Sequence, residues 1–181
     1  LRGHLGSLSA CGFLRGGAHG FTASADRMVK LWDLEKGQTL RSLPASSPVT
    51  AGAAHSGSGV IVVGHADGTT AVWDPRVSDA LSAPSAPASR RQSIAGICVA
   101  PDGRSYLSQA EDGVICLTSL ESGRTLLTLE GLGPVTGPSS PAFSPDSAHV
   151  LGRGASSVVC WNATTGERVC RHEAPAPVCV S

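Results

Sequence analysis

The chain has 181 residues, and its 14 Lys and Arg balance its 14 Asp and Glu, so the formal net charge at pH 7 is zero. This balance excludes a chain-wide basic field that would draw the protein to nucleic acid or to an anionic membrane. Apolar residues make up 41% and charged residues only 15%, which is sparse in charge for a soluble domain. Part of the surface is therefore expected to be covered.

The first predicted unit covers residues 1–43 and contains four strand-like runs. In its third run, Val29 and Leu31 point to one side while Met28 and Trp32 point to the other, so both faces are apolar. Such a strand needs cover on both faces. The strands of this unit are expected at residues 7–13, 21–24, 28–33 and 38–43.

The second predicted unit covers residues 44–91. Its first three strands are expected at 49–54, 60–63 and 69–73, and a weaker fourth strand at 77–82. Residues 83–91 are rich in Pro, Ala and Ser, which predicts a loop that leaves the sheet and returns.

The third and fourth predicted units cover residues 92–130 and 131–173, and residues 174–181 predict the start of a fifth unit. Pro138 and Pro141 interrupt the first strand of the fourth unit, which is tolerable only if that strand is an edge. The strands are expected at residues 94–100, 105–109, 114–117, 124–129, 135–143, 149–152, 157–161 and 167–171.

The third strands recur at a nearly constant distance. Trp32 to Trp73 is 41 residues, Trp73 to Thr118 is 45, and Thr118 to Trp161 is 43. A second match supports the repeat, because residues 120–126 (LESGRTL) copy residues 34–40 (LEKGQTL). A period of this length is typical of four-stranded blades that pack radially, each covered by its neighbours on both faces.

The sequence resembles the WD40 repeat family. Gly3-His4 followed by Trp32-Asp33, with Trp73-Asp74 and Trp161-Asn162 at matching places, carries the resemblance. It implies an all-β, β-propeller-type fold of about four WD40-like four-stranded antiparallel blades. Neither end is capped by polar residues, and terminal repeats normally are. We therefore expect these blades to belong to a larger, seven-bladed type of propeller in a longer chain.

The resemblance also implies a hydrogen-bonded chain within a blade. In the first unit it would join His4, Ser24, Asp26 and Trp32 and satisfy every polar group inside the blade. The same residue types occur in hydrolytic triads, but no Gly-x-Ser-x-Gly elbow accompanies them, which favours a structural role. The later units keep only parts of the network, namely Asp67, Trp73, Asp112 and Trp161.

The sequence predicts neither catalytic residues nor a metal or cofactor site. Cys170 and His172 lie on one strand face, but no C-x-x-C or H-x-x-x-H motif accompanies them. The glycine pairs at 57–59 and 152–154 open no helix, as a nucleotide loop would.

The resemblance places partners on the rim formed by the turns between second and third strands and the turns before first strands. The predicted function is that of a non-catalytic scaffold that mediates protein–protein interactions and complex assembly, with peptides or loops of other proteins as partners. A propeller-borne enzyme, a chromatin or nucleic-acid reader and a cytoskeletal scaffold stay open as alternatives. The candidate contact residues are Arg27, His65, Arg90, Arg91, Gln92 and Glu111.

The cysteines favour a reducing compartment. Five of the six lie in apolar strand-like runs, as buried free thiols do. No apolar run reaches the length of a membrane span, and residues 1–7 lack the layout of a signal peptide. We expect a cytoplasmic location, with a nuclear or cytoskeletal one possible, and no membrane partner.

Overall fold

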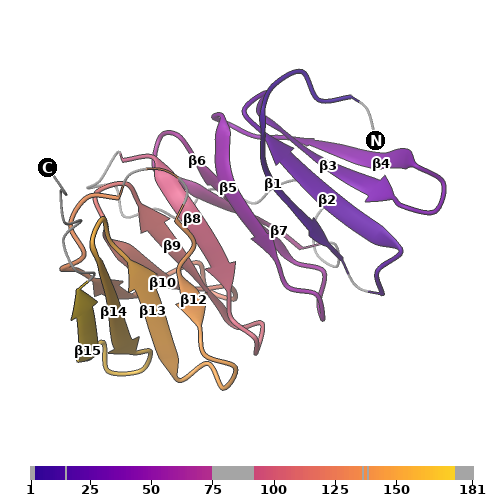
Figure 1. Ribbon diagram of the computed structural model, residues 1–181. Helices are drawn as coiled ribbons and strands as arrows, with labels where there is room; N and C mark the ends of the chain where they lie inside the picture. Colours follow the sequence, from indigo (N-terminus) through magenta and orange to yellow (C-terminus); the bar gives the residue numbers. More distant parts are fainter. Residues whose placement is uncertain (1–2, 15, 75–91, 136, 138, 174–181) are drawn as a thin grey trace, which may run out of the picture.

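The structure is a computed structural model that describes residues 3–14, 16–74, 92–135, 137 and 139–173 (Figure 1). Every regular element in these ranges is a β-strand. The predicted all-β class is confirmed. The same part of the chain contains no helix long and apolar enough to span a membrane.

The strands form four antiparallel sheets, which we call blades 1 to 4 in chain order. Blades 1, 3 and 4 have the orders β1-β2-β3-β4, β8-β9-β10-β11 and β12-β13-β14-β15, and the described part of blade 2 is β5-β6-β7. The strands are β1 (Leu8–Phe13), β2 (His19–Ser24), β3 (Met28–Asp33), β4 (Gln38–Pro44), β5 (Val49–Ala54), β6 (Ile61–His65), β7 (Thr70–Trp73), β8 (Ile94–Val99), β9 (Ser105–Ala110), β10 (Ile115–Ser119), β11 (Thr125–Leu129), β12 (Ala142–Phe143), β13 (His149–Arg153), β14 (Ser157–Asn162) and β15 (Arg168–Glu173).

The first strand of blade 4 is much shorter than predicted. We expected residues 135–143, but β12 contains only Ala142 and Phe143. The residues before it bond to blade 3 instead, because Ser139 N donates to Ala95 O at 3.1 Å and Ser140 Oγ donates to Ile97 O at 3.3 Å. Pro141 has no N–H for a sheet ladder. The predicted strand at 77–82, the loop at 83–91 and the fifth unit at 174–181 lie outside the described residues.

Apolar side chains fill each space between neighbouring blades. Phe21 and Val29 of blade 1 pack with Ile61 and Trp73 of blade 2, and similar clusters join blade 2 to blade 3 and blade 3 to blade 4. The first strands β1, β5 and β8 contact one another in turn, so the sheets stand side by side (Figure 1). Burial of these faces is the main stabilising force, and blade 2 covers the face of β3 that carries Val29 and Leu31.

The two end blades each expose an apolar face. Leu8 on β1 is 60% exposed, whereas Val49, which takes the same register position in blade 2, is 1% exposed. On blade 4, Leu151 and Val158 are 46% and 43% exposed. Within the described residues, these faces have no neighbouring blade.

Candidate functional site

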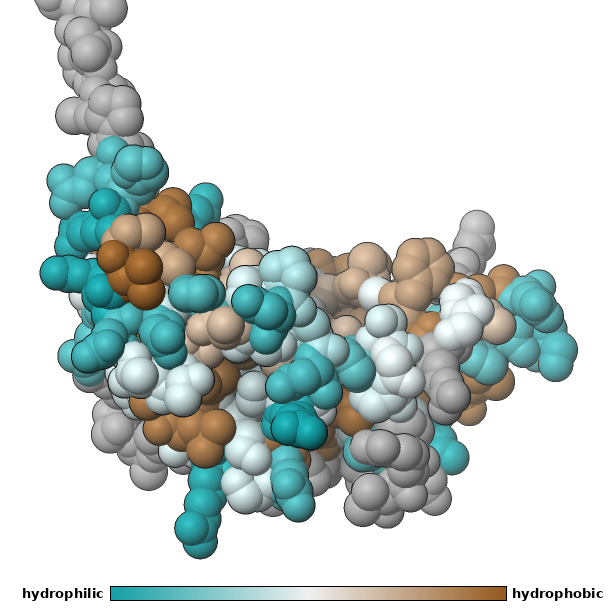
Figure 2. Space-filling view, turned by 90° about the horizontal axis from the view of Figure 1, so that it is seen from below, coloured by the Kyte–Doolittle hydropathy of each residue, from teal (hydrophilic) through white to brown (hydrophobic). Residues whose placement is uncertain are grey.

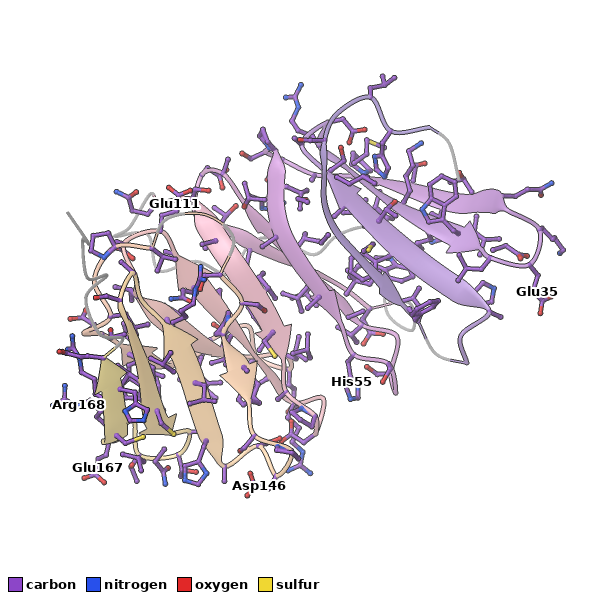
Figure 3. The ribbon with its side chains drawn as sticks, viewed as in Figure 1. Glu35, His55, Glu111, Asp146, Glu167 and Arg168 are labelled. Carbon is purple, nitrogen blue, oxygen red and sulfur yellow. The ribbon has the colours of Figure 1, made fainter. Side chains whose placement is uncertain are left out.

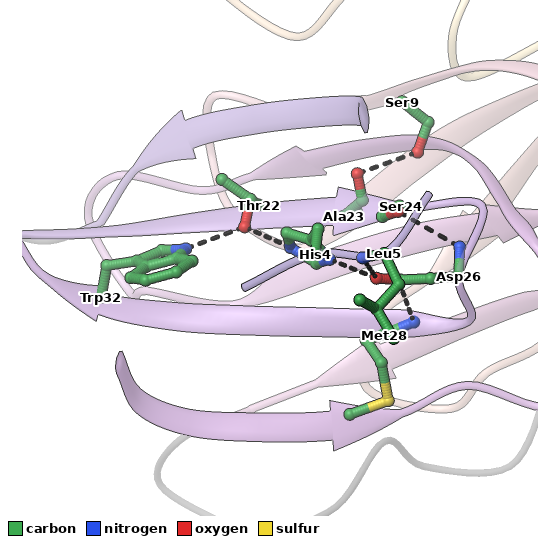
Figure 4. Close-up of polar contacts among 9 residues, drawn as sticks. All are labelled: His4, Leu5, Ser9, Thr22, Ala23, Ser24, Asp26, Met28 and Trp32. Carbon is green, nitrogen blue, oxygen red and sulfur yellow. Dashed lines mark hydrogen bonds and ion pairs between the residues drawn. The ribbon is translucent and has the colours of Figure 1, made fainter. Parts of the chain in front are cut away.

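A chain of polar side chains crosses blade 1 (Figure 4). Trp32 Nε1 donates to Thr22 Oγ1 at 2.8 Å, and Thr22 Oγ1 lies 2.7 Å from His4 Nε2. His4 Nδ1 lies 2.9 Å from Asp26 Oδ2, which also accepts from Leu5 N at 2.9 Å. With the proton of His4 on Nδ1, every donor in the chain meets an acceptor. The chain therefore ties the segment before β1 to β2 and β3.

The structure corrects one member of the predicted network. The hydroxyl between the imidazole and the indole belongs to Thr22, and not to Ser24. Ser24 is buried and its Oγ accepts from Asp26 N at 3.1 Å, which fixes the β2–β3 turn. Both side chains lie on the same face of β2, but Thr22 is nearer to Gly20, the cross-strand partner of Trp32.

Asp26 is the charged end of this chain. Burial alone would raise its pKa, but the hydrogen bond from Leu5 N and the hydrogen bond and charge of His4 lower the pKa to about 2. Asp26 Oδ1 also accepts from Met28 N at 3.0 Å. Asp26 is thus held as a carboxylate in the folded blade.

The polar chain has the connectivity of a hydrolytic triad but not its accessibility. The side chains of His4 and Asp26 are only 8% and 10% exposed. Thr22 Oγ1 also takes the N–H of Trp32, a residue that is 2% exposed. These contacts leave the hydroxyl enclosed within the blade, and they fit a structural role.

We expect Thr22→Val to destabilise the protein by about 1–3 kcal/mol, because His4 Nε2 and the Trp32 indole would each lose a partner. Val63 holds the position of Thr22 in blade 2, where Ile61 pairs with Trp73. Val63→Thr offers the reverse test, because Trp73 Nε1 is buried without a hydrogen-bond partner. Urea unfolding of both variants measures the changes, and equal effects of the same sign would contradict the assignment.

His65 is not a rim residue as predicted. Its side chain is fully buried at the end of β6, in the position that Ser24 holds in blade 1. His65 Nδ1 lies 2.9 Å from Thr69 Oγ1, which donates to Asp67 Oδ1 at 2.6 Å, while His65 Nε2 has no hydrogen-bond partner. Desolvation lowers the pKa of His65, and the nearby Asp67 carboxylate opposes this shift only in part.

Because His65 is buried, we expect the protein to lose folding stability in mild acid. Its pKa is lowered from 6.5 in the folded state, so below this pH the unfolded chain binds the proton more readily. The free energy of unfolding should therefore fall with falling pH, by up to about 1.4 kcal/mol per pH unit. Urea unfolding between pH 7.5 and 5.5 measures the slope. His65→Asn should flatten it, whereas His172→Asn on exposed β15 should not, and an unchanged slope in His65→Asn would refute the assignment.

Blades 3 and 4 keep less of the network. Asp112 Oδ1 accepts from Val114 N at 3.0 Å and so fixes the β9–β10 turn. Thr118 takes the tryptophan position in blade 3. In blade 4, Gly152 takes the position of Thr22, and a Cβ there would lie 2.9 Å from the ring of Trp161. Among the described residues, only blade 1 therefore has the complete chain.

The other predicted rim residues that the structure describes lie at one end of the sheets. The β2–β3, β6–β7 and β9–β10 turns are each bonded to the segment before the first strand of the same blade, through Ala25 N to Ser7 O, Ala66 N to Pro48 O and Glu111 N to Ser93 O. These bonds bring both kinds of turn to one rim. Figure 3 shows Glu111 at this edge, whereas His55, Asp146 and Glu167 lie at the opposite edge.

Arg27, Gln92 and Glu111 are exposed on this rim, and Arg90 and Arg91 lie outside the described residues. Arg27 has φ 64°, and Gly68 and Gly113 take the same turn position with φ 82° and 87°. A long side chain in the left-handed region is uncommon, and such conformations concentrate at functional sites. Arg27 is thus held outward at a strained position that glycine occupies in the next two blades.

The opposite edge of the sheets is mixed in hydropathy. Seen from that side, polar and apolar residues are interspersed (Figure 2). His55 joins two of its turns, because its Nδ1 lies 2.9 Å from Ser58 Oγ and its Nε2 lies 3.1 Å from Pro101 O. Across the described residues, no group of three or more His, Cys, Asp or Glu side chains could hold a metal ion.

The chain is similar to a repeat family and to three known proteins. The model for the "WD domain, G-beta repeat" family matches residues 1–33 and 37–74. Protein tipD of Dictyostelium discoideum is 25% identical over 93% of this chain and 28% of its own length. Autophagy-related protein 16 of Arabidopsis thaliana is 26% identical over 83% of this chain and 30% of its own length.

A third relative, Regulatory-associated protein of TOR 1 of Arabidopsis thaliana, is 33% identical over 56% of this chain and 8% of its own length. The chain thus spans less than a third of the length of each of these relatives. Taken with the antiparallel blades and the His4–Thr22–Trp32 chain of blade 1, the family match identifies residues 1–33 and 37–74 as WD40 repeats.

Proposed function

We propose that the chain is a non-catalytic scaffold that assembles protein complexes through the rim of its β2–β3 and β9–β10 turns. The observation that carries the proposal is the strained, outward Arg27. The polar groups inside blade 1 are used in structural hydrogen bonds, whereas Arg27 and the neighbouring turns remain available on a rigid surface. In WD40 proteins such a surface binds other proteins.

The rim suits a peptide or protein loop better than nucleic acid. Arg27 is cationic, Glu111 is anionic and Gln92 is neutral, and all three are exposed. Mixed charge recognises a partner of complementary pattern, whereas a nucleic-acid site needs clustered cations. The names of two relatives refer to autophagy and to association with TOR. We propose that the present chain has a similar role in a protein complex. It would act there together with other repeats of a longer chain.

We also propose a cytoplasmic location. The support is chemical, because Cys11, Cys98, Cys160 and Cys170 carry free thiols. Free thiols persist in reducing compartments.

A displayed random-peptide library tests the rim directly. Peptides selected on the purified chain should bind Arg27→Gly and Glu111→Gln at least about tenfold more weakly, because a few residues dominate an interface. Arg27→Gly is a suitable variant because glycine holds the same turn in blades 2 and 3. Glu167→Gln at the opposite edge is the matched control. Selected peptides that bind all three variants equally would overturn the proposed site.

A further inference from the structure

Two thiols face each other across the outermost strand pair of blade 4. Cys160 on β14 and Cys170 on β15 are directly opposed in the antiparallel register. Opposed residues of such a pair have Cα atoms about 4.5–5.5 Å apart, which lies within the range that a disulfide spans. The side chains are within hydrogen-bonding reach of each other, so the two thiols are placed to react with each other.

The pair is specific to blade 4 among the described residues. The same register positions hold Leu31 and Arg41 in blade 1 and Leu117 and Leu127 in blade 3. An apolar side chain is therefore the ordinary choice at the position of Cys160. The fold therefore does not require a cysteine at position 160 or at position 170.

The two thiols differ in reactivity. Cys170 is exposed, whereas Cys160 is half-buried. Burial raises the pKa of Cys160, and the adjacent Cys170 raises it further through its charge and its hydrogen bond. Because the thiolate is the nucleophile, Cys170 is the better attacking group and Cys160 the better second thiol.

We propose that Cys160 and Cys170 form a reversible redox site that is oxidised by small-molecule disulfides such as oxidised glutathione. The Cys170 thiolate attacks one sulfur of the oxidant, releases one glutathione thiol and forms a mixed disulfide. Cys160 then loses its proton and attacks the Cys170 sulfur, which forms the internal disulfide and releases the second glutathione thiol. The protein loses two hydrogens and two electrons, and the oxidant is reduced to two thiols.

The disulfide would fix the last described strand. All six residues of β15 are exposed, and its pairing with β14 is its main attachment. Arg171 adds contacts to Gly131 O at 3.4 Å and to Glu173 at 3.1 Å, both on the surface. A covalent link at the middle of β15 would suppress local opening of this strand. The redox state of the two cysteines would therefore determine how well ordered β15 is.

Peptide mapping after incubation in a glutathione redox buffer tests the proposal. Cleavage at arginine separates Cys160, in residues 154–168, from Cys170, in residues 169–171. The wild-type chain should yield these two peptides joined by a disulfide. Cys160→Val, which restores an apolar residue at this position, should instead retain glutathione on Cys170. Cys170→Ser should leave Cys160 at least about fivefold less modified than Cys170 is in Cys160→Val.

Cys11 supplies the matched control. It is an exposed thiol on an end strand, but its cross-strand neighbour is Thr22, so it should carry at most a mixed disulfide. Amide hydrogen exchange should show slower exchange in β15 of the oxidised wild-type chain, and no such change in either variant. Circular dichroism checks that both variants fold. A stable mixed disulfide at Cys170 of the wild type, or equal modification of the two single variants, would overturn the proposal.

Discussion

Trp32→Ala is expected to lower the melting temperature by roughly 10 °C, which corresponds to about 3–5 kcal/mol for a buried aromatic side chain in a chain of this size. Trp32 is 2% exposed, and its indole N–H is donated to Thr22 Oγ1 at 2.8 Å. The substitution leaves a cavity beside β2 and removes one end of the chain that reaches Asp26. Both effects act on the folded state.

Thr118→Ala is the matched comparison, because Thr118 holds the same register position in blade 3 and is also buried. Its hydroxyl bonds to Tyr106, but Tyr106 keeps a second partner in Thr70 Oγ1 at 2.8 Å. We expect a loss of only about 1 kcal/mol. Thermal unfolding followed by circular dichroism compares the two. Equal losses would mean that the polar chain of blade 1 contributes nothing beyond packing.

The repeat length and the two-sided apolar strands were enough to predict the all-β blades. A strand such as β3, with Val29 and Leu31 on one face and Trp32 on the other, needs apolar neighbours on both faces, and blade 2 supplies them for Val29 and Leu31. The position of each blade's third strand followed directly from this pattern. The register between strands was not visible at this level.

That missing register explains the error at Ser24. Ser24 and Thr22 are two residues apart and share one face of β2, so spacing alone does not say which hydroxyl meets the indole. The cross-strand pairing of Gly20 with Trp32 decides it. Thr22 could therefore have been identified from its position two residues after Gly20, the cross-strand partner of Trp32.

His65 shows a second limit of sequence reasoning. The family resemblance placed the turn that follows His65 on the rim, which made His65 a candidate contact residue. The structure buries it completely, and Thr69 provides a partner for Nδ1. The hydrogen bonds that link blades 3 and 4 were also not predicted. Gln109 donates to Arg153 O and accepts from Ser139 Oγ, and these partners lie 44 and 30 residues away in the sequence.

This link leads to the second large prediction, at Gly96 on β8. A Cβ on residue 96 would lie 1.5 Å from Ser139 O and 2.9 Å from Ser140 Cα. Both neighbours are backbone atoms, so no side-chain rotation relieves the clash. Ser139 N also donates to Ala95 O, and Ser139 Oγ donates to the fully buried Gln109. Gly96→Ala should therefore push the segment before β12 away from blade 3.

We expect Gly96→Ala to cost at least about 3 kcal/mol, since the forced separation also exposes the buried amide of Gln109. Hydrogen exchange should speed up first in β12 to β15, because these strands are held through this contact. Gly57→Ala is the control, since its Cβ would meet only the His55 ring, at 3.0 Å. Faster exchange confined to β1 to β4 would contradict this account. Because blade 4 packs against blade 3 through this junction, a single methyl group there should loosen a whole blade and not one strand.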